Sequence, residues 1–262
     1  MGEERIDEQQ LASLLNEKVD EYERPEFIGP DPISIPHRYS RRQDIEIAGV
    51  LSSTIAWGNR RSIVQSGERM MEMLGDSPYD FVMTASDKDI ERLSGFVYRT
   101  FQQSDLPGFI RGLRGIYSSW EGEDALERLF VRRKGETDLR PGLIRFRSAM
   151  IAKMEPRSHK HIADVSRGAA AKRLCMFLSW MVRSSARGVD FGIWRGISPR
   201  ELMMPLDVHV GNVGRALGLI RRRQNDWKTA VELTEELKRF CAEDPVRYDY
   251  ALFSLGIVEH LT

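Results

Sequence analysis

The feature that most constrains the fold of this chain is a helical spacing of apolar residues that recurs along nearly its whole length. Residues Leu11, Leu14, Leu15 and Val19 form one such stripe. Comparable stripes predict helices over 45–55, 63–74, 109–120, 144–154, 172–182, 208–217, 227–240 and 248–258. No segment alternates apolar and polar residues as a half-buried strand does. The predicted fold class is therefore all-α.

Composition sets the broad class of protein. A chain of 262 residues can bury one substantial core, or two lobes that share an interface. The N-terminus opens on charged residues without the apolar segment of a secretory signal, and no apolar run reaches the length of a membrane span. The only cysteines, Cys175 and Cys241, exclude a disulfide scaffold, a four-cysteine zinc site and an iron–sulfur cluster held by four thiolates. We expect a cytoplasmic protein without a metal or other cofactor.

The formal net charge is zero, which argues against a surface that is basic throughout. Nucleic-acid phosphates are nevertheless bound by local patches, and short basic clusters occur along the chain. One of them is the pair Arg60 and Arg61, which follows a predicted helix break at 58–59. A cluster of this kind is otherwise an ordinary solvated face.

The most informative motif is Pro-Leu-Asp-Val-His-Val at 205–210. Asp207 stands where the N-cap of the following helix is expected, so its carboxylate accepts main-chain N–H bonds and faces the positive helix end. Such a carboxylate stays ionised and can stabilise a developing cation on a sugar. The alternative is that Asp207 only caps the helix.

A second segment, Gly-Ala-Ala-Ala-Lys at 168–172, lies upstream of that motif. Together the two segments resemble the helix-hairpin-helix DNA glycosylase superfamily, in which a glycine-rich hairpin ends in a lysine and a Pro-x-Asp-x-His-Val run follows. The resemblance covers roughly residues 41–258. Through Pro-Asp-Pro-Ile-Ser-Ile-Pro-His at 30–37 and Ile-Ala-Trp-Gly-Asn-Arg at 55–60, the whole chain also resembles an uncharacterised conserved bacterial family thought to belong to this superfamily.

The interval between Lys172 and Asp207 is about twice that of most members and is similar to that of the archaeal 8-oxoguanine glycosylase branch. In that branch an aspartate and an aromatic residue one turn later, on the last helix, contact the flipped base. Asp249 and Phe253 stand at this spacing and project from one helix face. The alternative for this pair is a solvent-facing aspartate beside a core phenylalanine.

The resemblance implies a two-lobed helical fold with the active-site cleft between the lobes. Residues 41–187 would form the central lobe, which ends in the hairpin and the Lys172 helix. The two chain ends, 1–40 and 188–262, would form the second lobe, which carries Asp207.

The resemblance also implies roles for individual residues. Lys172 is the nucleophilic amine, and Asp207 assists it. Trp57 is a candidate aromatic platform for the flipped base. Gly168 and Ala169 are expected to bind DNA phosphate through main-chain N–H groups, although Ala170 stands where the hairpin usually has a second glycine.

The leading hypothesis is thus a glycosylase with abasic-site lyase activity that excises an oxidised purine from damaged duplex DNA. Two alternatives remain open. One is a non-catalytic nucleic-acid-binding protein that kept the fold. The other is an enzyme that uses the same cleft for a nucleoside or another small molecule.

Overall fold

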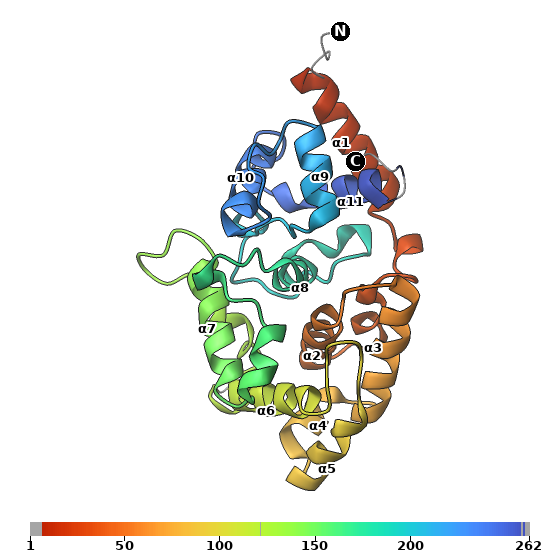
Figure 1. The fold of residues 1–262 in the computed structure, drawn as a ribbon, viewed down its shortest axis with the longest axis vertical. Helices are drawn as coiled ribbons and strands as arrows, with labels where there is room; N and C mark the ends of the chain where they lie inside the picture. The colour runs from red at the N-terminus through yellow and green to blue at the C-terminus, as the bar shows by residue number, and fades with distance from the viewer. Residues whose placement is uncertain (1–6, 121, 258, 260–262) are drawn as a thin grey trace.

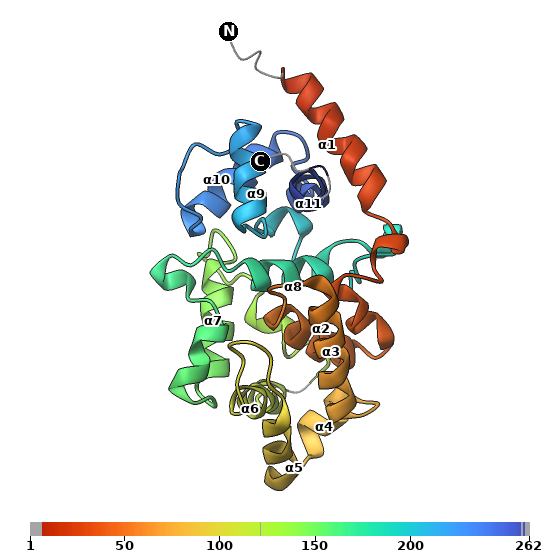
Figure 2. The ribbon, with the colours of Figure 1, turned by 45° about the vertical axis from the view of Figure 1, so that its right-hand side comes forward.

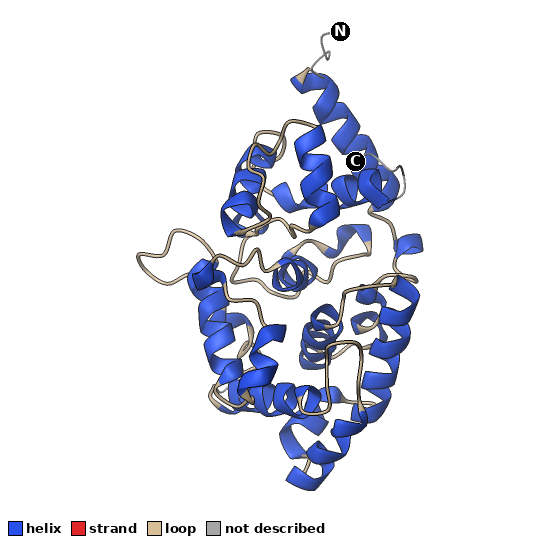
Figure 3. Cartoon of the chain, viewed as in Figure 1, coloured by secondary structure: helices blue, strands red, loops and turns tan. Residues whose placement is uncertain are grey.

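The computed structural model of the chain describes residues 7–120, 122–257 and 259. Within these residues the secondary structure is helical, with eleven α-helices, short 3-10 turns between them and no β-strand (Figure 3). The predicted all-α class is confirmed. The helices are α1 (Glu8–Tyr22), α2 (Arg42–Thr54), α3 (Arg60–Leu74), α4 (Pro78–Thr84), α5 (Asp87–Arg92), α6 (Asp105–Ser118), α7 (Arg140–Ile151), α8 (Lys172–Val182), α9 (Val208–Ala216), α10 (Trp227–Lys238) and α11 (Asp249–Ile257).

Helix α8 lies between two groups of helices (Figures 1 and 2). Helices α2 to α7 lie on one side, where α2 packs on α8 and α4, and α6 packs on α4 and α7. Helices α1, α9, α10 and α11 lie on the other side, where α11 contacts both α1 and α9. The two ends of the chain therefore share one group, and α8 borders both.

The sequence of α8 suits this central place. Residues of the helix are buried on nearly all sides, including Leu174, Phe177 and Met181. On the facing helix α2, a Cβ built on Gly49 would lie 3.1 Å from the Phe177 ring. The absence of a side chain at Gly49 thus lets the two helices approach closely. Only the first turn of α8 carries charged side chains.

Two helices begin earlier than predicted. Helix α7 begins at Arg140 and not at 144, with Pro141 in its first turn, where the main-chain N–H that a proline lacks would have no partner within the helix. Helix α2 begins at Arg42 and not at 45, so Asp44 lies in its first turn. The Asp44 carboxylate accepts the Tyr79 N–H at 2.7 Å and the Ser77 hydroxyl at 3.1 Å. It thus stabilises the start of α4, a contact that local sequence does not reveal.

Among the described residues, no helix combines the length and the apolar character needed to cross a bilayer.

Candidate functional site

The site is built around Lys172 and Asp207, which two helix N-termini bring together. Lys172 is the first residue of α8, and Asp207 is the N-cap of α9, where its carboxylate accepts the Val210 N–H at 3.0 Å. The N-cap prediction for Asp207 is confirmed. The Lys172 Nζ lies 3.7 Å from Asp207 Oδ2, and each side chain is about one quarter exposed. The pair is therefore held by the fold and still open to a ligand.

Asp249, the first residue of α11, adds a second carboxylate to the pair. Burial raises the pKa of Asp249 to about 7, the charge of Lys172 opposes that rise and the charge of Asp207 adds to it. Near neutral pH this carboxyl is present in both protonation states. It can therefore donate a hydrogen bond or accept one, and it can give up or take a proton.

Asp31 brings a third carboxylate from the proline-rich segment. Burial raises its pKa, which the Ile33 N–H and the charges of Arg60 and Lys172 lower in turn. The Arg60 guanidinium lies 3.7 Å from Asp31 and stacks over the Phe253 ring at 4.6 Å. Asp31, Arg60 and Phe253 thus belong to the same cluster as Lys172. We call Asp31, Arg60, Lys172, Asp207, Asp249 and Phe253 the acid–base cluster.

The other residues predicted to bind DNA lie at different places. Arg61 is exposed on α3 beside the cluster. The Gly168 N–H donates to the Val165 carbonyl at 3.1 Å, and the Ala169 N–H donates to the Asp164 carbonyl at 3.2 Å. These two hairpin N–H groups are therefore already hydrogen-bonded within the chain, so the free donors of the hairpin lie further along, at the first turn of α8.

The hairpin places its left-handed residues at Gly168, with φ of 89°, and at Ala171, with φ of 55°. Ala170, which stands where a second glycine was expected, does not have a positive φ. Its methyl group therefore causes no backbone strain. The strained alanine is Ala171, the N-cap of α8, which makes no side-chain cap.

Trp57 lies beside the first turn of α8, and the aromatic and cation contacts of its ring are not with Phe253. Its ring stacks on His161 with centroids 5.9 Å apart, and the Arg173 guanidinium lies 4.8 Å from its centroid. The Tyr98 hydroxyl donates to the Trp57 carbonyl at 2.8 Å. Trp57 is thus held by neighbours on the α2 side of α8, whereas Phe253 belongs to the acid–base cluster.

A family model described as protein of unknown function (DUF2400) matches residues 31–258. The chain belongs to this family. The DUF2400 match begins at Asp31 and includes every member of the acid–base cluster. No curated protein matches the chain, and no solved structure matches it.

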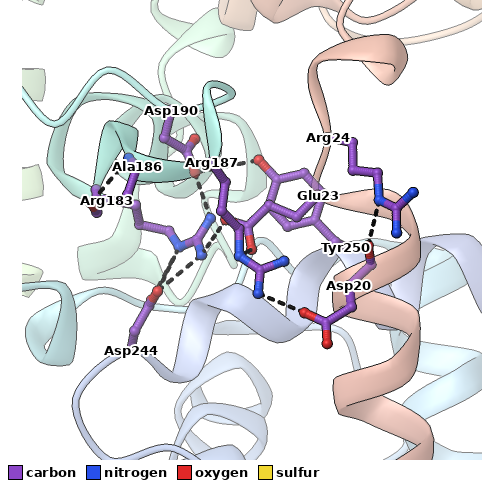
Figure 4. Close-up of polar contacts among 10 residues, drawn as sticks. Asp20, Glu23, Arg24, Arg183, Ala186, Arg187, Asp190, Asp244 and Tyr250 are labelled. Carbon is purple, nitrogen blue, oxygen red and sulfur yellow. Dashed lines mark hydrogen bonds and ion pairs between the residues drawn. The ribbon is translucent and has the colours of Figure 1, made fainter.

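A buried ion-pair network lies behind the cluster of this DUF2400 protein (Figure 4). Arg183, directly after α8, donates to Asp244 at 2.9 to 3.1 Å and to Asp190 at 2.5 Å, and it pairs with Glu23 at 2.7 Å. Burial lowers the pKa of Arg183, but Asp190 and Asp244 hold it well above its usual value. Burial also raises the pKa of Asp190 to about 7.

This network ties down the segments that carry the cluster's acids. The Tyr250 hydroxyl donates to Asp190 at 3.3 Å, and Tyr250 is the residue after Asp249 (Figure 4). Glu23 is the C-cap of α1, and the turns that carry Asp31 follow it. The network thus fixes both segments against the end of α8.

Sequence reasoning found four of the six cluster residues as substrate or catalytic residues, and Arg60 as a DNA-binding residue. It did not include Asp31 among the site residues: in the proline-rich segment, Asp31 with His37 can line a pocket, or it can cap and turn the chain, as an Asp before proline often does. Within the described residues, no three His, Cys, Asp or Glu side chains are arranged to hold a metal ion.

Proposed function

We propose that this chain is a DNA glycosylase with abasic-site lyase activity, which excises an oxidised purine of the 8-oxoguanine type from damaged duplex DNA. The observation that carries the proposal is the 3.7 Å contact between the Lys172 amine and the Asp207 carboxylate, next to Asp249. The proposed fold is the two-lobed helix-hairpin-helix glycosylase fold, with residues 41–187 and the two chain ends as its lobes. The arrangement of helices on both sides of α8 supports it.

The chemistry begins with the amine of Lys172, which attacks C1′ of the damaged nucleotide once it has lost its proton to Asp207. The bond between C1′ and the base breaks, and the base leaves with the bonding electrons. It takes up one proton, for which Asp249 is a donor near neutral pH because its pKa is about 7. Asp207 passes the proton that it took from Lys172 to solvent water, and its carboxylate then stabilises positive charge on the sugar.

The C1′–O4′ bond then breaks, one proton of the lysine nitrogen moves to O4′, and a protonated Schiff base forms between C1′ and Lys172. The Asp249 carboxylate, which has given its proton to the base, takes up a C2′ proton, and the 3′ phosphate leaves with the electrons of the C3′–O bond. Water hydrolyses the C1′–N double bond and frees the lysine.

Recognition of the base is assigned to Asp249 and Phe253. A carboxyl that can donate or accept suits the hydrogen-bonding edge of a purine, and an aromatic face suits its ring. Arg60 covers the Phe253 ring in the free protein, so an incoming base would displace this guanidinium or stack against it.

The test is borohydride trapping with duplexes that contain 8-oxoguanine or an abasic site. We expect a covalent adduct with the wild-type protein, none with Lys172→Gln, and at least about a hundredfold slower trapping with Asp207→Asn, since general catalysis by one group is worth roughly 10²–10⁴-fold. Asn still caps a helix, so Asp207→Asn leaves stability nearly unchanged. Absence of an adduct on every lesion, under conditions that trap a known lyase, would refute the proposal.

One observation favours the alternative of an enzyme for a nucleoside or another small molecule. The cluster holds three carboxyl groups and only two cations, which disfavours a phosphate at its centre. Saturable binding of deoxyguanosine without DNA binding or trapping would support this alternative. Salt-dependent binding of duplex DNA without an adduct would instead support a non-catalytic binding protein.

A further inference from the structure

The Phe253 ring of α11 is half-buried, yet its surroundings differ from those of other half-buried rings. Phe81, Phe191 and Phe240 pack on the hydrophobic core, whereas Phe253 is not among the described side chains that do so. The group over its face is the Arg60 guanidinium, 4.6 Å from the ring centroid. A cation thus occupies a position that apolar side chains occupy at the other rings.

The Arg60 guanidinium is held less firmly than comparable groups. In the described part of the chain, three other guanidinium groups lie within 5.0 Å of a ring centroid, and each also donates a hydrogen bond: Arg41 to Asp80, Arg69 to the Val97 carbonyl and Arg173 to the Thr54 carbonyl. Arg60 donates none to a described residue, and its ion pair with Asp31 is long, at 3.7 Å. Its position therefore depends on the ring and on a loose ion pair.

Asp31 is fixed in place and has an oxygen to spare. Its Oδ1 accepts the Ile33 N–H at 3.0 Å, which holds the carboxylate in its turn. That turn packs on α3, where a Cβ built on Gly67 would lie 2.9 Å from the Ile35 side chain. Asp31 Oδ2, which faces Arg60, accepts no hydrogen bond from a described residue. A guanidinium that moves closer can therefore form the short, charge-assisted hydrogen bond that is missing here.

Only the side chain of Arg60 needs to move. Its main chain starts α3, where the Asn59 side chain caps the helix by accepting the Ser62 N–H at 3.2 Å. The side chain reaches from α3, in one group of helices, to Phe253 of α11 in the other (Figure 2), and 43% of it is exposed. Exposed side chains change rotamer within nanoseconds, so this movement requires no change in the packing of the helices.

We propose that Arg60 is a gate on Phe253: its guanidinium covers the ring in the free protein, and a planar heterocycle takes its place while the guanidinium moves onto Asp31. A cation over a ring and an aromatic stack are worth similar amounts, so the ring contact that is lost is replaced by one of similar strength. The closer ion pair with Asp31 then favours the exchanged state.

The charges of the cluster define the class of heterocycle. Asp31, Asp207 and Asp249 surround the site with carboxyl groups, which disfavour an anionic ring and favour a neutral one. That this ring is a purine base of DNA rests on the proposed function, whereas the exchange itself does not. On this proposal Arg60 acts on the ligand ring, and not on phosphate as the basic pair at 60–61 led us to expect.

The first test concerns the free protein. If Arg60 lies over Phe253, the ring current shifts the Arg60 side-chain NMR signals upfield, and Phe253→Leu abolishes this shift. Titration of the full chain with 8-oxodeoxyguanosine should also abolish it, because the guanidinium leaves the ring. Signals of Arg60 that are the same in Phe253→Leu and in the wild type would overturn the gate.

The second test is the affinity for the same nucleoside, measured by calorimetry. Arg60→Gln keeps the helix propensity of this position and removes the cation. This variant should bind the nucleoside about two- to fivefold more tightly, the factor expected for one exposed cation–π contact that no longer has to be broken. Weaker binding would show that the guanidinium stacks on the bound ring, and absence of saturable binding by both proteins would show that no exchange occurs. Either result would overturn the gate.

The matched control is Arg41→Gln. The Arg41 guanidinium also covers a ring, that of Tyr79 at 4.4 Å, and also pairs with an aspartate, Asp80 at 2.8 Å, but it lies outside the acid–base cluster. This variant should bind the nucleoside as the wild type does. Circular dichroism of all variants separates a changed gate from a changed fold.

A double-mutant cycle tests the part assigned to Asp31. Asp31→Asn can still accept the Ile33 N–H, but it cannot form an ion pair with the displaced guanidinium. It should weaken nucleoside binding about twofold, as for loss of a surface ion pair, and it should have no effect in the Arg60→Gln background. An equal loss in both backgrounds would show that Asp31 acts on the ligand directly and would overturn its role in the gate.

The gate and the proposed function fail separately. If the nucleoside displaces Arg60 but no lesion gives a borohydride adduct, the gate stands and the glycosylase proposal fails. If an adduct forms but the Arg60 signals do not depend on Phe253, the glycosylase proposal stands and the gate fails.

Discussion

Asp249 allows a direct measurement of the electrostatics at the acid–base cluster. Its pKa is about 7 in the folded protein, against 3.8 for an unperturbed aspartate. Between these two values the unfolded chain has released the proton while the native protein still holds it. The unfolded state therefore binds fewer protons, and the native protein loses stability as the pH rises from about 4 to about 7. Above that range both states are ionised and the effect is constant.

The size of the effect follows from the difference in pKa. About three pKa units correspond to about 4 kcal/mol in the free energy of unfolding. Asp249 keeps partial contact with solvent, so we expect about 2 kcal/mol. Asp249→Asn cannot ionise and lacks this dependence. The stability of the variant relative to the wild type should thus increase by about 2 kcal/mol between about pH 4.5 and about pH 8.

The assay is urea unfolding of both proteins at the two pH values, followed by circular dichroism. Other titrating groups, including the buried Asp190, are present in both proteins and cancel in the difference. A difference that does not change with pH would refute a raised pKa at Asp249. A variant that becomes relatively less stable at high pH would show that Lys172 stabilises the ionised carboxylate more than burial destabilises it.

The remaining predictions concern the supports of the site. Arg183→Met should lower the free energy of unfolding by about 3–5 kcal/mol, because it leaves the buried Asp190 without a cation and removes a partner of Glu23 and of Asp244; a loss below about 1 kcal/mol in urea unfolding would contradict this. Ala171→Gly should change stability by less than about 1 kcal/mol, since relief of the left-handed strain at φ of 55° is offset by the greater freedom of glycine in the unfolded chain. Ala171→Val should cost more than about 1 kcal/mol, because a β-branched residue fits this conformation poorly, and thermal unfolding of the two variants should therefore separate them clearly.

The apolar spacing alone was enough for the helical class and for several helix boundaries. Helix α8 spans the predicted residues 172–182, and Asp207 caps α9 as its motif indicates. Both depend on hydrogen bonds and packing periodicity within a few residues of chain. The short helices α4 and α5 were not predicted, because seven and six residues are too few to form a recognisable stripe.

Only part of the acid–base cluster could be predicted from sequence spacing and motifs. A four-residue spacing puts Asp249 and Phe253 on one face of α11, and the resemblance joins them to Lys172. Neither indicates that Arg60 lies over the Phe253 ring and pairs with Asp31. Those residues come from segments whose approach depends on how the buried faces of α2, α3 and α11 pack.

The sequence by itself thus determined which of the longer segments are helical, where α8 and α9 begin and most of the residues that carry the candidate chemistry. Only the tertiary structure decided which charges share an environment: three carboxyl groups near Lys172, and Arg183 enclosed by acids. The physical reason is the distance along the chain over which each kind of interaction acts. Caps and apolar stripes act within one or two turns, whereas burial and charge pairing depend on residues that lie far apart along the chain and meet only when the helices pack.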